Sequence, residues 1–271
     1  MIRDLLVHVD ASEAGVSRLR YALDLAARHE ARLTGVHVIA PTDVPPLYKP
    51  SKLRQVERVL EDRSQRDALS AELIFREVAG ERPTQTAWKV FEGRMADQLA
   101  DHARYADLVI VGQYESEGAA EHRATSLADD LVVKCGRPLM VIPESTAGAP
   151  EIQRAVLAWD GSREAVRAAH DVIPLLIAAQ CALEIVSIDK ASRDVDELAG
   201  HLRAHGVALG ETFHLDSQGR TGAALVSHLQ VRRYDLLVIG AYSHSAWREF
   251  LLGGVTRTML HHSPLPVFVS H

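Results

Sequence analysis

The hydrophobic positions of the chain alternate between short, continuous apolar runs and longer segments with helical spacing. In the first half, the apolar runs predict strands at residues 4–9, 32–39, 86–91, 107–111 and 139–142. The segments between them predict helices at 14–29, 51–79, 94–104 and 124–135. Because strands and helices take turns, the pattern predicts right-handed βαβ crossovers and a parallel sheet covered on both faces.

The same pattern occurs twice. The segment Leu5–Ser12 returns as Ala155–Ser162, 150 residues later, and Tyr105–Gly112 returns as Tyr234–Gly240, with the two glycines 128 residues apart. The second copy is therefore 22 residues shorter in its middle, and its long helix is reduced to about 193–205. One duplication with one internal change of length explains both offsets.

The repeat predicts two α/β domains in tandem, each a five-stranded parallel sheet between helices, with a Rossmann-like arrangement. A small, polar linker bounded by Pro143 and Pro150 divides the chain into domains at 1–147 and 148–271. Pro174 predicts a kink or a late start in the first helix of the second copy.

Composition and charge exclude several classes of protein. The chain is 47% hydrophobic, 24% charged and has a net charge of −6, with 19 Lys/Arg against 23 Asp/Glu in residues 1–147 and 11 against 13 in 148–271. Neither half has the basic surplus of a nucleic-acid-binding protein. No segment approaches the roughly 20 apolar residues of a membrane span, and the N-terminus does not resemble a secretory signal. Two distant cysteines argue against a disulfide framework. We expect a cytoplasmic protein that binds neither nucleic acid nor membrane.

Polar residues follow the first strand of each copy, as Asp10-Ala11-Ser12 and Asp160-Gly161-Ser162. Ligands of open parallel sheets bind outside the carboxyl ends of the strands, so an aspartate or serine here can hydrogen-bond a ribose. The same residues are also common helix caps, which is the more frequent use of this pattern. The sequence leaves both readings open.

The loop after the fourth strand of the second copy carries a more specific pattern. It reads Gly240-Ala241-Tyr242-Ser243, nine residues, then Gly253-Gly254-Val255-Thr256. This arrangement resembles the universal stress protein family, whose nucleotide-binding members carry G-x-x-G, nine residues, then G followed by Ser or Thr. Gly240 and Gly253 match that motif, whereas Ser243 and Gly254 depart from it. The glycines of such a loop let backbone N–H groups approach phosphates at a helix N-terminus.

The resemblance implies an adenine nucleotide alpha hydrolase-like fold that holds ATP or another adenine nucleotide, with Mg²⁺ as its companion ion. Because members of that family commonly dimerise through their last strand, the resemblance also implies that the last strands here, 139–143 and 266–270, pair within the chain as a pseudo-dimer. Whether this unit pairs again as a homodimer stays open. It also implies an adenine contact at the end of the second strand, at Val38 in the first copy and Ile188 in the second, where core packing is the alternative. The predicted nucleotide site of the second copy consists of Asp160, Gly161, Ser162, Ile188, Gly240, Ser243, His244, Gly253, Gly254, Val255 and Thr256.

The first copy has lost most of this loop motif. It reads Gly112-Gln113-Tyr114-Glu115, nine residues, then Thr125-Ser126, so that Glu115 stands where the family has a glycine. A carboxylate beside a phosphate is repelled, the more so when water is excluded. We therefore expect one nucleotide per chain, in the second copy.

The function implied by the resemblance is that of a nucleotide-responsive stress regulator with little or no catalysis. One alternative is a scaffold of the same fold that binds no nucleotide, and another is a slow ATP hydrolase. The sequence has no G-x-S-x-G elbow and no Walker lysine motif. We predict no metal site among the 14 histidines, because we identify no H-x-x-x-H pair or His/Cys cluster with ligand spacing. The adjacent His261 and His262 would point to different faces of a helix.

Overall fold

The computed structural model describes residues 1–41, 50–80, 82, 84–113, 127–146, 151–188, 194–215, 221–242 and 254–271, with the backbone alone for 50–53 and 188. The strands of the first half are β1 (Asp4–His8), β2 (Arg32–Ile39), β3 (Thr86–Glu92), β4 (Leu108–Gly112) and β5 (Leu139–Ile142). Those of the second half are β6 (Arg154–Trp159), β7 (Ala182–Ile188), β8 (Ala208–Leu215), β9 (Leu236–Gly240) and β10 (Val267–Ser270). The five strands predicted for the first half are confirmed to within one residue at each end.

All ten strands form one sheet, in the order β3-β2-β1-β4-β5-β10-β9-β6-β7-β8. Within each half the pairing is parallel, which confirms the expected five-stranded parallel sheets. The strand order reverses between β1 and β4 in the first domain and between β6 and β9 in the second. Ligands of open α/β sheets bind beyond the carboxyl ends of the strands at such reversals. The topology therefore places a candidate crevice in each domain.

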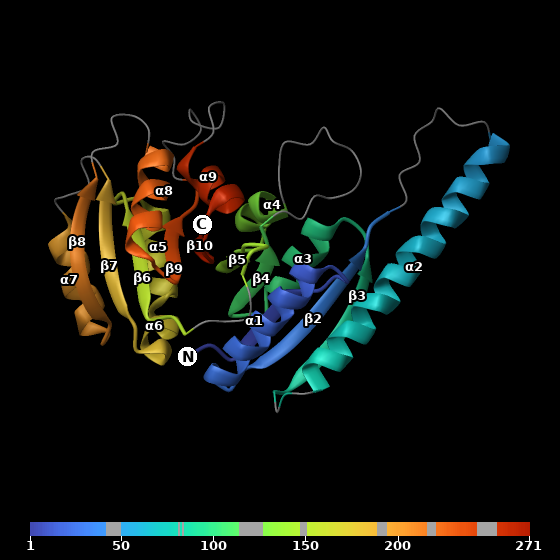
Figure 1. The fold of residues 1–271 in the computed structure, drawn as a ribbon, viewed down its shortest axis with the longest axis horizontal. Helices are drawn as coiled ribbons and strands as arrows, with labels where there is room; N and C mark the ends of the chain where they lie inside the picture. The colour runs from blue at the N-terminus through green and yellow to red at the C-terminus, as the bar shows by residue number, and fades with distance from the viewer. Residues whose placement is uncertain are drawn as a thin grey trace.

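Helices cover both faces of the sheet, as Figure 1 shows. One core, on the face of Leu5 and Leu157, receives α1 (Glu13–His29), α2 (Pro50–Gly80), α5 (Arg163–Asp171), α6 (Ile173–Ala179) and α7 (Val195–Ala204). The other core, on the face of Leu6 and Val156, receives α3 (Met95–Ala103), α4 (Leu127–Lys134), α8 (Thr221–Arg232) and α9 (Val255–His262). No described helix is long and apolar enough to cross a bilayer.

The break predicted at Pro174 is observed. The first helix of the second domain ends at Asp171, and α6 restarts at Ile173 with the proline in its first turn. Proline is tolerated there because the first-turn N–H groups have no partner within the helix. The long helix of the first domain and its shortened counterpart, α7, also lie where the repeat placed them.

The two domains join through their last strands, as predicted. β10 pairs antiparallel with β5, with Phe268 opposite Met140, so the two end strands close each other's edges at the centre of the sheet (Figure 1). A buried side-chain contact crosses the same junction, where Gln113 Nε2 donates to the Ser263 carbonyl at 3.0 Å. The predicted domain boundary at residue 147 lies outside the described residues and stays a prediction.

Candidate functional site

The candidate site of the second domain begins in the loop between β6 and α5. Asp160 Oδ1 accepts from the Ser162 N–H at 2.9 Å, and Ser162 Oγ accepts from the Ala165 N–H at 3.1 Å. Ser162 is thus the N-cap of α5, which confirms the capping alternative for this residue. Gly161 has φ +72°, a left-handed conformation that favours glycine. Asp160 is exposed, and among the described residues none donates to its Oδ2.

A second carboxylate lies beside this loop and was missed by the sequence analysis. Asp194 immediately precedes α7, and its Oδ2 lies 3.8 Å from the position that a Cβ on Gly161 would occupy. The acidic residue at the start of the helix after β7 was the signal that could have found it. Asp160 and Asp194 together give this crevice hydrogen-bond acceptors of the kind that ribose hydroxyls or a hard cation use.

Gly240, the first glycine of the loop motif, ends β9 against the start of α5. A Cβ on Gly240 would lie 2.3 Å from the Ala165 nitrogen and 2.5 Å from the Glu164 carbonyl carbon. Glycine at this position therefore has a packing reason in addition to the one that the motif implies. The contact also brings the two loops of the site together at the point where the strand order reverses.

The helix that follows the loop, α9, begins at Val255, and Gly254 is its N-cap residue. Val255 and Thr256 form its half-buried first turn, and this turn has no acidic residue. Arg257 lies in the same turn. The predicted residues Ser243, His244 and Gly253 lie outside the described residues, and Ile188 is placed only by its backbone, opposite Leu215 on β8.

The helix at the same place in the first domain carries the opposite charge. In α4, Asp129 and Asp130 lie in the first turn, and Asp129 occupies the position that Arg257 occupies in α9, 128 residues later. An acidic first turn attracts cations to a helix N-terminus and repels phosphate, whereas a basic one favours phosphate. The predicted departures Glu115, Thr125 and Ser126 lie outside the described residues.

The first domain also fills the end of its crevice with its own side chains. Arg18, only 2% exposed, donates from Nη2 to Asp10 Oδ2 at 2.6 Å and from Nε to the His8 carbonyl at 2.8 Å. Burial raises the pKa of Asp10, but the Arg18 guanidinium and the hydrogen bonds from Ser12 outweigh it and lower the pKa to about 2. Val38, the predicted adenine contact, is 3% exposed in the core.

At the same positions the second domain has small side chains. Ala168 stands where the first domain has Arg18, and Ala158 stands where it has His8. Two polar atoms at the carboxyl ends of β6 and β7, Trp159 Nε1 and Ser187 Oγ, are buried without a hydrogen-bond partner among the described residues. These two residues are paired in register. A buried polar atom without a protein partner calls for a water molecule or a ligand atom.

A buried carboxylate of the first domain contacts the segment after β9 in the second domain. Asp129 on α4 accepts from the Tyr242 hydroxyl at 2.7 Å and contacts His261 Nε2 on α9 at 2.7 Å. Tyr242, two residues beyond β9, has φ +53°, an unfavourable backbone conformation for a residue with a Cβ. Burial and the hydrogen bond to Asp129 raise the pKa of Tyr242, so its hydroxyl remains a donor.

We expect the Tyr242→Phe variant to lose about 1.5 kcal/mol of unfolding free energy, because a hydrogen bond to a buried carboxylate is removed while the ring is kept. Urea unfolding at pH 7 measures the loss. The control is Tyr105→Phe, at a tyrosine that is 83% exposed, which should change the free energy by less than about 0.5 kcal/mol. Equal effects for the two variants would contradict the role given to Asp129.

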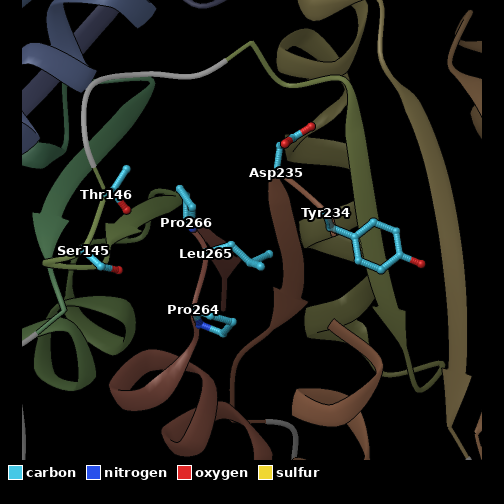
Figure 2. Close-up of a pocket in the computed structure, with 7 residues that line it drawn as sticks. All are labelled: Ser145, Thr146, Tyr234, Asp235, Pro264, Leu265 and Pro266. Atoms are coloured by element: carbon cyan, nitrogen blue, oxygen red, sulfur yellow. The ribbon is translucent and has the colours of Figure 1, made fainter. Parts of the chain in front are cut away.

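A pocket of about 230 Å³ lies at the domain junction, away from the crevice (Figure 2). It is lined by Ser145, Thr146, Tyr234, Asp235, Pro264, Leu265 and Pro266. Its polar groups are largely engaged elsewhere, since Asp235 Oδ2 accepts the N–H groups of Gln153 and Arg154 at 2.9 Å. The Tyr234 ring extends away from the other lining residues, and its hydroxyl donates to Glu184 on β7 at 2.6 Å. This pocket is therefore not the candidate site.

Comparisons with known proteins agree with this architecture. The family model of the universal stress proteins matches residues 1–143 and 203–271. A universal stress protein of Synechocystis sp. is 25% identical over 179 residues, which are 65% of this chain and 61% of that protein. This chain thus spans about three-fifths of the length of that relative.

Two solved structures show the same fold along the whole chain. A universal stress protein from Archaeoglobus fulgidus has a TM-score of 0.68 at 16% identity, covering 98% of this chain and 95% of its own. A protein described as a putative universal stress protein from Pseudomonas aeruginosa has a TM-score of 0.56 at 14% identity, covering 99% and 93%. With two copies of the fold joined in one sheet and a family model matching most of its length, the chain belongs to the universal stress protein family.

Proposed function

We propose that this protein binds one adenine nucleotide in its second domain and that the first domain serves as its structural partner. The observation that carries the proposal is the charge reversal between two equivalent helices. Arg257 lies in the first turn of α9, at the position where α4 has the carboxylate of Asp129. Phosphates are favoured at a helix N-terminus with a basic first turn and are disfavoured at an acidic one.

The loop after β6 supports the same assignment. Oδ2 of the exposed Asp160, to which no described residue donates, is suited to accept from ribose hydroxyls, whereas the equivalent oxygen of Asp10 accepts from Arg18. Ala158 and Ala168 leave the end of this crevice without the His8 and Arg18 side chains of the first domain. The residues present thus fit an adenine nucleotide in the second domain better than in the first.

In this proposal the nucleotide is a signal more than a substrate. Efficient phosphoryl transfer needs metal ligands, a positioned water and a cation at the developing charge. Asp160 and Asp194 could hold Mg²⁺, which would screen the phosphate charge, and Arg257 could contact the phosphates. Among the described residues of the crevice we identify no general base. We therefore favour a nucleotide-responsive stress regulator over an ATP hydrolase, and a scaffold without ligand remains the alternative.

Isothermal titration of the purified chain with ATP and Mg²⁺ should give one site per chain. The Gly253→Val variant should abolish binding, because a β-branched residue blocks close approach of the backbone to phosphate. The Arg257→Asp variant should weaken binding about tenfold by giving α9 the charge of α4. As a matched control, Glu115→Gly in the first domain should leave the stoichiometry near one.

Two results would contradict this proposal. A wild-type stoichiometry of two would show that the first domain binds as well, and unchanged binding by Gly253→Val would place the ligand elsewhere. A thermal-shift series with ATP, ADP, AMP and cyclic AMP separates the regulator from the scaffold. A ligand that binds the native state raises the unfolding midpoint, so a scaffold without a nucleotide site would show no shift with any of the four.

A further inference from the structure

Three exposed histidines gather on the second domain, outside the nucleotide crevice. His170 lies at the end of α5, His201 lies in the last turn of α7, and His205 is the C-cap of α7. Both helices cover the same face of the sheet. Each side chain offers one ring nitrogen, and these three nitrogens all lie within 4.8 Å of one another. The sequence analysis passed over the spacing His201-x-x-x-His205, and His170 comes from a different helix.

The backbone around the cluster is held in place, and the three histidine side chains are exposed. The His205 N–H donates to the His201 carbonyl at 3.2 Å, so the two side chains share one helical face. Leu202, between them, is fully buried, and Gly206 ends the turn with φ +82°. On α5, the buried Ala169 fixes the turn that carries His170. A metal ion would therefore be bound through rotation of the exposed imidazoles on a fixed backbone.

The ring geometry is close to that of a three-histidine metal site. The ring centroids of His201 and His205 are 4.5 Å apart, and that of His170 lies 6.1 Å and 5.7 Å from them. In a tetrahedral site with Zn–N bonds of about 2.0–2.1 Å, the ligating nitrogens lie roughly 3.4 Å apart. The observed limit of 4.8 Å leaves about 1.5 Å to close, within the reach of side-chain rotation.

The electrostatics of the position favour a cation. The cluster lies at the C-terminal ends of α5 and α7, where the helix dipoles present their negative ends. The arrangement belongs to the second domain alone, because Arg20 occupies the position equivalent to His170 in the first domain. Neutral imidazole is a ligand for zinc, copper and nickel, and three histidines with an open fourth position are a known zinc arrangement.

We propose that His170, His201 and His205 bind one Zn²⁺ ion, with the fourth coordination position open to water or to a ligand atom. A metal held between α5 and α7 would link the helix that follows β6 to the helix that follows β7. These are the two helices whose N-terminal ends flank Asp160 and Asp194. The site is separate from the nucleotide crevice, since its three ligands lie at the opposite ends of those helices.

The test is a calorimetric titration of the metal-free chain, without a polyhistidine tag, with ZnCl₂. We expect one Zn²⁺ per chain. The variants His170→Asn, His201→Asn and His205→Asn should each weaken binding at least about tenfold, since loss of a second-shell partner alone costs 10–100-fold. His214→Asn, at an exposed histidine on β8 outside the cluster, is the matched control and should bind as the wild type does.

A second measurement separates binding from folding. Because the three histidines are exposed, the metal-free variants should unfold at the wild-type midpoint. Zn²⁺ should raise the midpoint of the wild type more than that of a triple variant in which His170, His201 and His205 are all replaced by asparagine. The proposal is overturned if the wild type takes up no Zn²⁺, or if the triple variant binds it as tightly as the wild type. The cluster lies apart from Asp160 and Asp194, so an absence of ATP binding would leave the Zn²⁺ result unchanged, and the two proposals can fail independently.

Discussion

The Asp10→Ala variant should lose about 3 kcal/mol of unfolding free energy at pH 7, whereas Asp160→Ala should lose less than about 1 kcal/mol. The two aspartates occupy equivalent positions in the repeat. Asp10 is paired with the buried Arg18, and its removal leaves a buried guanidinium without its carboxylate. Asp160 is exposed, and Ala168 stands where the first domain has Arg18. Urea unfolding monitored by circular dichroism measures both changes.

The difference in unfolding free energy between the wild type and Asp10→Ala should depend on pH. Arg18 and Ser12 outweigh burial and lower the pKa of Asp10 to about 2 in the folded chain, against about 3.9 for an unfolded aspartate. A lowered folded-state pKa adds stability above the unfolded pKa, here about 2.5 kcal/mol, and this stability is lost as the pH falls through the folded pKa. The free-energy difference between the wild type and Asp10→Ala should therefore shrink progressively between about pH 5 and pH 1.

In ATP binding the larger effect should come from Asp160→Ala, although Asp10→Ala has the larger effect on stability. Asp160→Ala removes a carboxylate that we place against the ribose and should weaken ATP binding by about tenfold or more, the effect of losing a charged hydrogen-bond acceptor. Asp10→Ala should bind ATP as the wild type does, at temperatures where it is folded. If Asp10→Ala loses binding and Asp160→Ala retains it, the ligand is in the first domain and our assignment is wrong.

Local sequence patterns were sufficient for the fold because each element has its own signal. The apolar run at 32–39 coincides with β2, and the long charged segment at 51–79 lies within α2. Pro174 predicted the break in the first helix of the second domain, and the repeat identified the last strand of each copy, which the resemblance to the family led us to pair. These features depend on residues close together in the chain or on the comparison of one copy with the other.

The chemistry of the site was less predictable because it depends on side chains that meet only in the folded chain. Nothing in the sequence around Asp10 indicates that Arg18 turns back onto it, or that Asp129 of one domain accepts from Tyr242 of the other. The spacing of His201 and His205 could have indicated part of the histidine cluster. His170 joins them only because α5 and α7 cover the same face of the sheet. The cap formed by Ser162 was foreseen, since capping is a local contact.

The Gly240→Ala variant should lose about 3 kcal/mol of unfolding free energy, because the added Cβ would lie 2.3 Å from a backbone atom of α5. Neither β9 nor the start of α5 can move easily to relieve this contact. β9 is a central strand between β6 and β10, and the Ala165 N–H is held by Ser162.

The opposite result is expected at Gly200 in α7, where a Cβ would meet no atom within 4 Å. Alanine there should add about 0.5–1 kcal/mol, as expected for a helix interior.

The Gly240→Ala variant also distinguishes between two reasons for a glycine at position 240, which are packing against α5 and close approach of the backbone to phosphate. If packing against α5 is the main one, Gly240→Ala unfolds at lower urea, and its ATP affinity falls because the Asp160–Ser162 loop moves with the helix. If close approach to phosphate is the main one, the variant keeps the wild-type unfolding midpoint and loses only ATP binding. The 2.3 Å and 2.5 Å approaches to the Ala165 nitrogen and the Glu164 carbonyl carbon favour the first outcome. A wild-type midpoint for Gly240→Ala would show that β9 and α5 can separate at little cost, and the rigidity that we ascribe to this end of the crevice would then be wrong.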